Sequence, residues 1–266
     1  MNVISLSVFD LSLAALLVLL LAGLTWRLKT GDTSALLIAG LRTVVQLMLI
    51  GYVLTLIFSA GNWYWVAAIM AVMLLVAGYE VNARQHRPFS GLWGYGLGTA
   101  SMFVSSFTLL LLVLLVLVQP EPWYKPQYSI PLLGMLLGNS MTGIALSLDR
   151  LTESAWKQRH EIEARLMLGQ GWNEAISSVR TEALRSGLMP IINAMAAAGV
   201  VSLPGMMTGQ ILSGTPPVEA SKYQILIMFL ITAASGLGSL LAVHYGARHL
   251  FDERQRLTLS RLKTVA

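Results

Sequence analysis

Several polar side chains lie within segments that are otherwise apolar, and they are the first candidates for chemistry. They are Arg42, Gln46, Glu80, Asn139, Thr142, Asn193 and Gln210. A charge at the centre of a bilayer costs about 3 kcal/mol on insertion scales, so such residues usually face a bundle interior or a watery cavity. Amide oxygens suit harder cations, whereas thioethers suit soft ones. The set therefore predicts a translocation path through a membrane-embedded helical bundle.

Arg42 and Glu80 each have more than one interpretation. Gln46 follows Arg42 by one helical turn on the same face. Arg42 either snorkels to the membrane surface as an anchor, pairs with Glu80, or lines a path for an anion. Glu80 has a second candidate partner in Arg84, which follows at i+4 in the favourable acid-first order.

The stretch from Leu203 to Gln210 contains a helix breaker. Pro204 removes a backbone donor and Gly205 loosens the next turn, which predicts a kink or a break near the outer leaflet. A broken helix is tolerated in hydrocarbon only where protein or a watery cavity satisfies the freed backbone groups. Either this helix is merely kinked and packed, or it lines the path with Pro204, Gly205, Met207, Thr208 and Gln210.

The sequence does not assign metal ligands. Four of the thirteen methionines, Met141, Met195, Met206 and Met207, could form a ladder for a soft ion. Methionine is also an ordinary filler of apolar helices, and we favour that interpretation. The four histidines are scattered, and cysteine is absent.

Catalytic motifs are missing from the sequence. There is no Gly-x-x-x-x-Gly-Lys-Ser/Thr phosphate loop, which excludes an ATPase in this chain, and no HExxH motif. A membrane-embedded enzyme would need a convergent catalytic set, and none is visible. A secondary transporter or channel would need buried acidic relays. Only Asp10, Glu80 and Arg42 are candidates for that role, so this class is kept as the alternative.

The composition is typical of a polytopic membrane protein. Of the 266 residues, 55% are hydrophobic and 12% are charged, whereas about a quarter are charged in soluble domains. Seven apolar runs reach the about 20 residues needed to cross hydrocarbon. They are residues 6–26, 35–58, 63–81, 97–118, 130–148, 187–211 and 223–243. We expect an all-α integral membrane protein with seven spans and one transmembrane domain over residues 1–266.

Lysines and arginines set the predicted orientation. If the N-terminus lies outside, 15 of the 18 fall in inner segments, Lys125 and Lys222 lie outside, and Arg42 lies within a span. Cytoplasmic segments are enriched in these residues. The sequence therefore predicts the N-terminus outside and the C-terminus inside, and the net charge of +5 reflects orientation rather than nucleic-acid binding.

The 38 residues from Asp149 to Ser186 form the longest run that is too polar for hydrocarbon. Gly169 and Gly171 break it into two helical patterns. In the second pattern the apolar residues follow the i, i+3, i+4, i+7 spacing of one helix face: Trp172, Ala175, Ile176, Val179 and Ala183. Two helices that are attached to spans at both ends predict a cytoplasmic docking platform over residues 149–186.

Three stretches carry a family resemblance: residues 42–47, residues 138–143, and residues 202–214 with the sequence Leu-Pro-Gly-Met-Met-Thr-Gly. They resemble the FetB-type iron-export permeases, which are membrane subunits of ABC transporters, and plant permeases linked to aluminium tolerance. The resemblance covers about residues 42–251. Glu163 and Ala164, followed by Gly169, are also similar to the EAA loop of ABC importer permeases, although Arg165 replaces its second alanine and no Leu-Pro follows.

The resemblance implies a permease subunit that works with a separate cytoplasmic ABC ATPase, which would bind ATP and Mg²⁺. It implies a permease homodimer in a bacterial inner membrane, with lipid around it, no nucleic-acid partner and no cofactor in this chain. Residues 149–186 then become an ATPase-coupling loop that includes Glu163, Ala164, Gly169, Gly171 and Trp172. Glu163 and Gly169 are expected at its turn, and Trp172 is expected to make an apolar contact. The substrate stays open, because bacterial members are linked to iron export and plant relatives also to a nucleotide sugar.

Overall fold

The computed structural model describes residues 7–29, 31, 33–60 and 62–263. The start of the first predicted span, Leu6, lies outside these residues. The regular elements of the described ranges are helices. Three isolated β-bridges are also present there. The chain divides into two compact units, residues 1–62 with 212–214 and residues 63–211 with 215–266, and each is described by itself.

The first unit contains α1 (Val8–Leu28) and α2 (Thr33–Ala60). A capping box begins α1: the Asp10 N–H donates to the Ser7 hydroxyl at 3.3 Å, and the Ser7 N–H donates to the Asp10 carboxylate at 2.8 Å. The two helices are in contact, because a Cβ on Gly40 would lie 3.5 Å from Val18. The Thr25 and Thr33 hydroxyls lie 3.1 Å apart where the chain turns between them.

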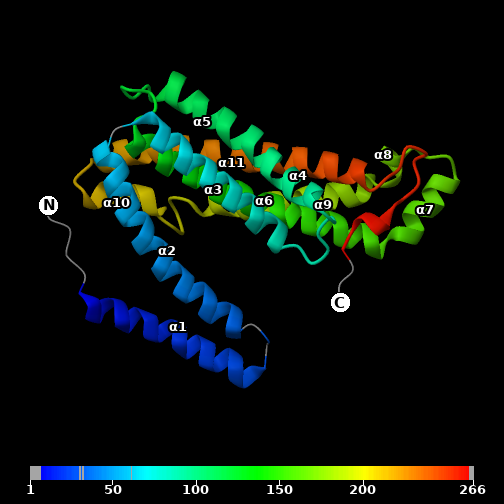
Figure 1. The fold of residues 1–266 in the computed structure, drawn as a ribbon, viewed down its shortest axis with the longest axis horizontal. Coiled ribbons are helices and arrows are strands. Elements are labelled where there is room, and N and C mark those ends of the chain that lie inside the picture. Colours follow the sequence, from blue (N-terminus) through cyan, green and yellow to red (C-terminus); the bar gives the residue numbers. More distant parts are fainter. Residues whose placement is uncertain (1–6, 30, 32, 61, 264–266) are drawn as a thin grey trace. The chain divides into compact units, whose positions relative to one another are not determined.

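The second unit is a bundle built around α6 and α11 (Figure 1). Its elements are α3 (Trp63–Ala83), α4 (Leu92–Met102), α5 (Thr108–Leu112), α6 (Pro126–Lys157), α7 (Arg159–Met167), α8 (Trp172–Ala175), α9 (Ser177–Ala197), α10 (Gly205–Leu212) and α11 (Pro217–His249). The π-helical turn η1 (Phe103–Phe107) joins α4 to α5, and a second one, η2 (Val113–Leu117), follows α5, so that the four form one continuous span. A short 3₁₀ turn, η3 (Leu259–Arg261), lies in the tail.

Small residues bring the central helices unusually close. A Cβ on Gly143 of α6 would lie 2.3 Å from the Ser235 hydroxyl of α11, and one on Gly187 of α9 would lie 1.8 Å from the Ser147 hydroxyl. Ser147 and Ser235 are almost fully buried. Close backbone approach through small residues is how helices associate when lipid removes the hydrophobic driving force.

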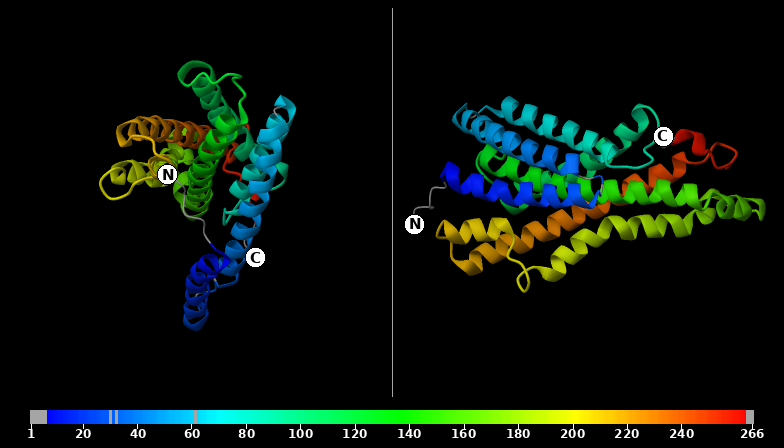
Figure 2. Two further views of the ribbon diagram at one scale, coloured as in Figure 1. Left: turned by 90° about the vertical axis from the view of Figure 1, so that its left-hand side faces the viewer. Right: turned by 90° about the horizontal axis from the view of Figure 1, so that it is seen from below.

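The multi-pass helical architecture is confirmed, but the number of spans differs from the prediction. Within the described ranges six helices are long and apolar enough to cross a membrane. The predicted span 187–211 is not one helix: α9 ends at Ala197 and α10 begins at Gly205 (Figure 2, right). With only eight residues, α10 is about 12 Å long and too short to cross alone.

The two ends of the second unit differ in character. We call one the polar end, which comprises the loop 84–91, residues 149–186 and the tail 250–263; Figure 1 shows α7, α8 and the red C-terminal tail together there. The other, the aromatic end, carries Trp63, Tyr64, Trp123 and Tyr124. At 32 and 33 residues, α6 and α11 are about 48–50 Å long, so they exceed the about 30 Å of hydrocarbon. Residues 149–186 are therefore less a loop than the protruding ends of α6 and α9 with α7 and α8 between them.

Candidate functional site

The polar end is held together by contacts between segments far apart in the sequence. The backbone N–H of His86 donates to the Asp149 carboxylate at 2.7 Å. The Arg87 guanidinium donates to the Glu153 carboxylate at 3.2 Å and lies 4.4 Å above the ring of Trp156. These contacts fasten the turn between α3 and α4 to the protruding end of α6.

The protruding ends of α6 and α9 are also joined to each other. Arg150 on α6 and Glu182 on α9 form an ion pair. Val179 and Ala183, which the sequence placed on the apolar face of this segment, are buried as predicted. Residues 158–176 therefore stand on a rigid base rather than on a flexible loop.

The outermost structure of the polar end is α7 and the turn that follows it. Ile162 is buried and anchors α7, whereas Glu163 is half exposed and Ala164 is exposed. The turn closes when the Leu168 N–H donates to the Ala164 carbonyl at 3.1 Å, and Gly169 takes a φ of +89°. Met167 and Leu168 each remain 83% exposed at the tip. Two adjacent apolar side chains so exposed in a polar region are typical of a binding surface.

Trp172 follows this turn and contacts the C-terminal part of the chain. Its backbone N–H donates to the side-chain oxygen of Gln255 at 3.0 Å. The Arg248 guanidinium lies 5.5 Å from the centre of its indole ring, and the Phe251 ring lies 6.0 Å away. The indole ring of Trp172 therefore contacts both an aromatic ring and a cation of this chain, and its part in ATPase coupling stays a prediction.

The C-terminal tail, residues 250–263, continues from its contacts with Trp172 back to the α3–α4 turn. Residues 250–257 form a hairpin in which the Arg256 N–H donates to the Asp252 carboxylate at 2.8 Å, and this backbone hydrogen bond lowers the pKa of Asp252. Beyond the hairpin, the Ser90 N–H donates to the Arg261 carbonyl at 2.8 Å and the Lys263 N–H to the Pro88 carbonyl at 2.9 Å. One tail thus links Trp172 to the loop between two spans.

The interruption between α9 and α10 begins earlier in the chain than the sequence predicted. The Thr232 hydroxyl donates to the Met195 sulfur at 2.8 Å, and Thr232 is roughly 20 Å along α11 from its start at the aromatic end. The helix ends before Pro204, at Ala197, and Gly199 has a φ of +82°. The break therefore begins upstream of Pro204, beside the middle of α11.

The break exposes apolar residues to the surroundings of this chain. Val200 is 89% exposed and Val201 is 82% exposed. Pro204 and Gly205 mark the start of α10: the Pro204 carbonyl accepts hydrogen bonds from the Thr208 N–H at 3.1 Å and from the Thr208 hydroxyl at 3.2 Å. A Cβ on Gly205 would meet no atom within 4 Å, so this glycine is not required by packing.

Gln210 is the predicted path residue for which the structure shows a pocket. Gln210 lines a pocket of about 280 Å³ at the aromatic end, with Met206, Gln127, Tyr128 and Tyr223. Met207 lies just outside this lining, where its sulfur accepts a long contact from the Ser221 hydroxyl at 4.0 Å.

The other predicted path residues do not line this pocket. On α6, the Asn139 amide donates to the Met135 carbonyl at 2.8 Å and the Thr142 hydroxyl to the Gly138 carbonyl at 3.2 Å. Asn193 is exposed on α9. Their part in a translocation path stays a prediction.

One of the ion pairs predicted for Glu80 and Arg42 is present in the structure. Glu80 forms the predicted i, i+4 ion pair with Arg84, with 3.7 Å between the charged atoms. Arg42 and Gln46 lie on exposed positions of α2 in the first unit, and a pairing of Arg42 with Glu80 stays a prediction. In the described residues, no three His, Asp or Glu side chains gather so that they could hold a metal ion.

Comparison with known proteins places the chain in a family. The family model described as "Uncharacterised protein family (UPF0014)" matches residues 8–251. The chain belongs to the UPF0014 family of membrane proteins. No solved structure matches this UPF0014 protein.

Curated relatives cover most of this UPF0014 protein. A UPF0014 membrane protein of Synechocystis is 40% identical over 85% of the chain and 86% of its own length. The "Probable iron export permease protein FetB" of Escherichia coli is 28% identical over 96% of both chains. The "Protein ALUMINUM SENSITIVE 3" of Arabidopsis thaliana is 32% identical over 87% of this chain and 83% of its own. The resemblance found in the sequence is thereby confirmed.

Three features of the site escaped the sequence-based prediction. The exposed Met167 and Leu168 could have been recognised, because two large apolar residues stand directly before a glycine in a charged segment. Gln255 had no such signal, because its partner Trp172 is 83 residues away. Gly199 could not be recognised from the sequence, because its role depends on a left-handed backbone conformation and not on its neighbours in sequence.

Proposed function

We propose that this UPF0014 protein is the membrane-spanning permease subunit of an ABC transporter, and that a separate cytoplasmic ATPase docks on α7 and the turn 168–171. The observation that carries the proposal is the exposed pair Met167 and Leu168 at the outermost point of the polar end. An apolar tip of this kind is costly in water unless a partner covers it. The absence of a phosphate loop from the sequence is the second support, because transport by this class needs ATP hydrolysis elsewhere.

The polar end has the mechanical properties that such a docking site needs. Ion pairs fasten the bases of α6, α9 and the α3–α4 turn to one another. A push on α7 would therefore move the protruding ends of several spans as one body. Glu163, exposed beside the tip, is the charged member of the docking surface, and Gly169 shapes its turn.

Orientation and assembly follow from the same features. Clustering of Lys and Arg at the polar end supports a cytoplasmic location for it, with the N-terminus outside. Non-helical backbone at mid-membrane is tolerated only where protein or a watery cavity covers it. The exposed Val200 and Val201 therefore support a permease homodimer in which a second copy covers the break.

Iron or another metal leaving the cytoplasm is the substrate that we propose, and a nucleotide sugar is the alternative. The support for iron is the name of the Escherichia coli relative. A path built from Asn139, Thr142, Asn193 and Gln210 would offer amide and hydroxyl oxygens to a hard cation that keeps part of its water shell.

The test is co-purification of the full chain with ABC ATPase subunits of the same organism, in lipid. The double variant Met167→Ser/Leu168→Ser should lose the ATPase. Leu92→Ser, which changes another exposed apolar residue directly after the loop 84–91 (86% exposed), should retain it. Stimulation of ATP hydrolysis by Fe(II), but not by UDP-glucose, would support metal export. If the double variant binds the ATPase as well as wild type does, the proposed docking site is wrong. If the wild-type chain binds no ATPase, an ATPase-independent transporter becomes the better hypothesis.

A further inference from the structure

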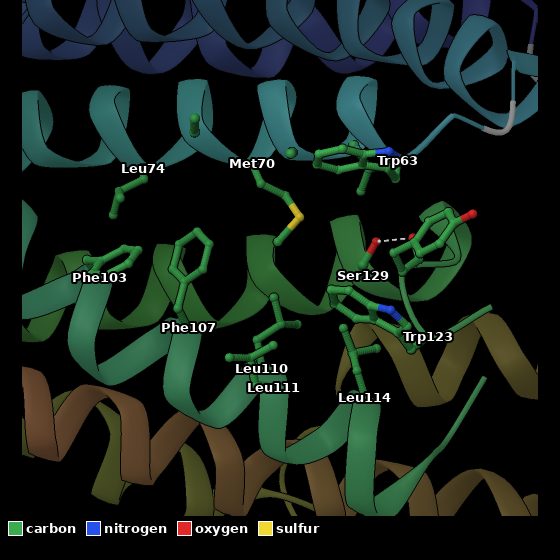
Figure 3. Close-up of a pocket in the computed structure, with 14 residues that line it drawn as sticks. Trp63, Met70, Leu74, Phe103, Phe107, Leu110, Leu111, Leu114, Trp123 and Ser129 are labelled. Carbon is green, nitrogen blue, oxygen red and sulfur yellow. Dashed lines mark hydrogen bonds between the residues drawn. The ribbon is translucent and has the colours of Figure 1, made fainter. Parts of the chain in front are cut away.

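A lateral cavity of about 510 Å³ opens between α3 and the span formed by α4, η1, α5 and η2 (Figure 3). Its volume lies within the about 300–1,000 Å³ that is common for ligand sites. Val66, Leu110 and Leu114 form its floor and are at most 2% exposed, whereas Trp63 and Phe103 on its walls are more than half exposed. The cavity is thus a concave groove that is open on one side.

The groove narrows and closes toward the polar end. Below it the two helices are in direct contact, because a Cβ on Gly78 would lie 2.0 Å from the Thr99 hydroxyl and one on Gly98 would lie 3.0 Å from Val81. The lining on α3 runs from Trp63 to Leu74, which is about 16 Å of helix. This length matches one leaflet of an about 30 Å hydrocarbon core.

The side chains that line the groove are apolar along its length, and tryptophan and tyrosine lie at its end. Trp63 and Trp123 lie at the same end of the groove (Figure 3), and the next residue, Tyr124, also lines it, as expected of rings at a membrane interface. The hydroxyl of Ser129, which Figure 3 labels in the groove, donates to the Tyr124 carbonyl at 3.3 Å and is therefore satisfied by the protein itself.

We propose that this groove binds one acyl chain of a phospholipid from the leaflet at the aromatic end. An acyl chain enters at the interface and ends at mid-membrane, where the groove ends. A transmembrane helix from a partner could not stop there, because its terminal backbone groups would be left unsatisfied in hydrocarbon. The inference needs only membrane insertion and stands apart from the proposed transport function.

The experiment uses the full chain in phosphatidylcholine nanodiscs that contain a phosphatidylcholine with a diazirine at the end of one acyl chain. After photolysis, labelled peptides are mapped by mass spectrometry. Labelling should concentrate in residues 66–74 and 103–111. Ala71→Phe, which fills the groove from its exposed lining, should lower this labelling several-fold, whereas Ala68→Phe, on an exposed position outside the lining, should not.

Three outcomes would overturn the proposal. One is equal labelling of all exposed helix faces, which would indicate ordinary annular lipid. Another is unchanged labelling in a monodisperse Ala71→Phe variant. The third uses the absence of cysteine from the sequence: if Ala71→Cys chains crosslink to one another in the membrane, a second copy and not lipid covers the groove.

Discussion

The backbone N–H of Trp172 donates a hydrogen bond to the side-chain oxygen of Gln255, with 3.0 Å between nitrogen and oxygen. The contact joins the first residue of α8 to a tail turn in which Gln255 itself has a φ of +59°. The same tail also contacts the α3–α4 turn, where the Ser90 N–H donates a hydrogen bond to the Arg261 carbonyl. The orientation of the exposed tip therefore depends on the last residues of the chain.

We predict that Gln255→Met loosens residues 168–176. Methionine keeps the length of the side chain but removes the amide oxygen, and a typical hydrogen bond contributes about 0.5–1.5 kcal/mol. Hydrogen exchange of residues 168–176 should become about three- to tenfold faster. Gln255→Glu retains an acceptor oxygen and should exchange like wild type; faster exchange in both variants would mean that the acceptor is not what holds Trp172.

Gly169 is predicted to tolerate asparagine but not valine. Its φ of +89° is left-handed, and this region costs non-glycine residues about 1–2 kcal/mol, more for a β-branched one and less for asparagine. A Cβ there would meet no atom within 4 Å, so the effect is one of backbone conformation alone. Gly169→Val should weaken ATPase binding with little change in melting temperature, and Gly169→Asn should bind normally. Equal binding by both variants would contradict a role for the turn.

Gly187→Ala should destabilise the bundle strongly. The new methyl group would lie 2.5 Å from the backbone carbonyl of Gly143 as well as against Ser147, and overpacking typically costs about 1–3 kcal/mol or more. We expect a fall of roughly 5 °C or more in the melting temperature in detergent. A Cβ on Gly138, which lies on α6 like Gly143, would meet no atom within 4 Å, so Gly138→Ala serves as the control. If the two variants melt alike, α6 and α9 are not in the close contact described.

The position of the break can be tested with two glycines. Gly199 has a φ of +82°, whereas Gly205 is helical with open space around it. Gly205→Ala should be neutral or stabilising by about 0.5–1 kcal/mol, and Gly199→Val should reduce both melting temperature and transport. A damaging Gly205→Ala with a silent Gly199→Val would place the functional hinge at Pro204 after all.

Most of the architecture followed from local properties of the sequence. Runs of apolar residues identified the spans, because hydrocarbon accepts only long helices with satisfied backbones. The Lys and Arg bias identified the polar end, and the glycine pair 169 and 171 identified the turn beyond α7. The i, i+3, i+4 pattern after Trp172 predicted the buried Ile176 and Val179. Each of these signals lies within one helix or one turn.

Other features were decided only by the tertiary structure, because they depend on residues distant in sequence or on backbone angles. Pro204 indicated a break, but the helix ends earlier, where Gly199 adopts a left-handed conformation. Gly187 resembles any other small residue in an apolar run until the backbone of Gly143 is seen 2.5 Å from its Cβ position. Composition determined that this chain crosses a membrane many times; the packing of helices with one another decided where they touch, where they part, and which residues the polar end presents.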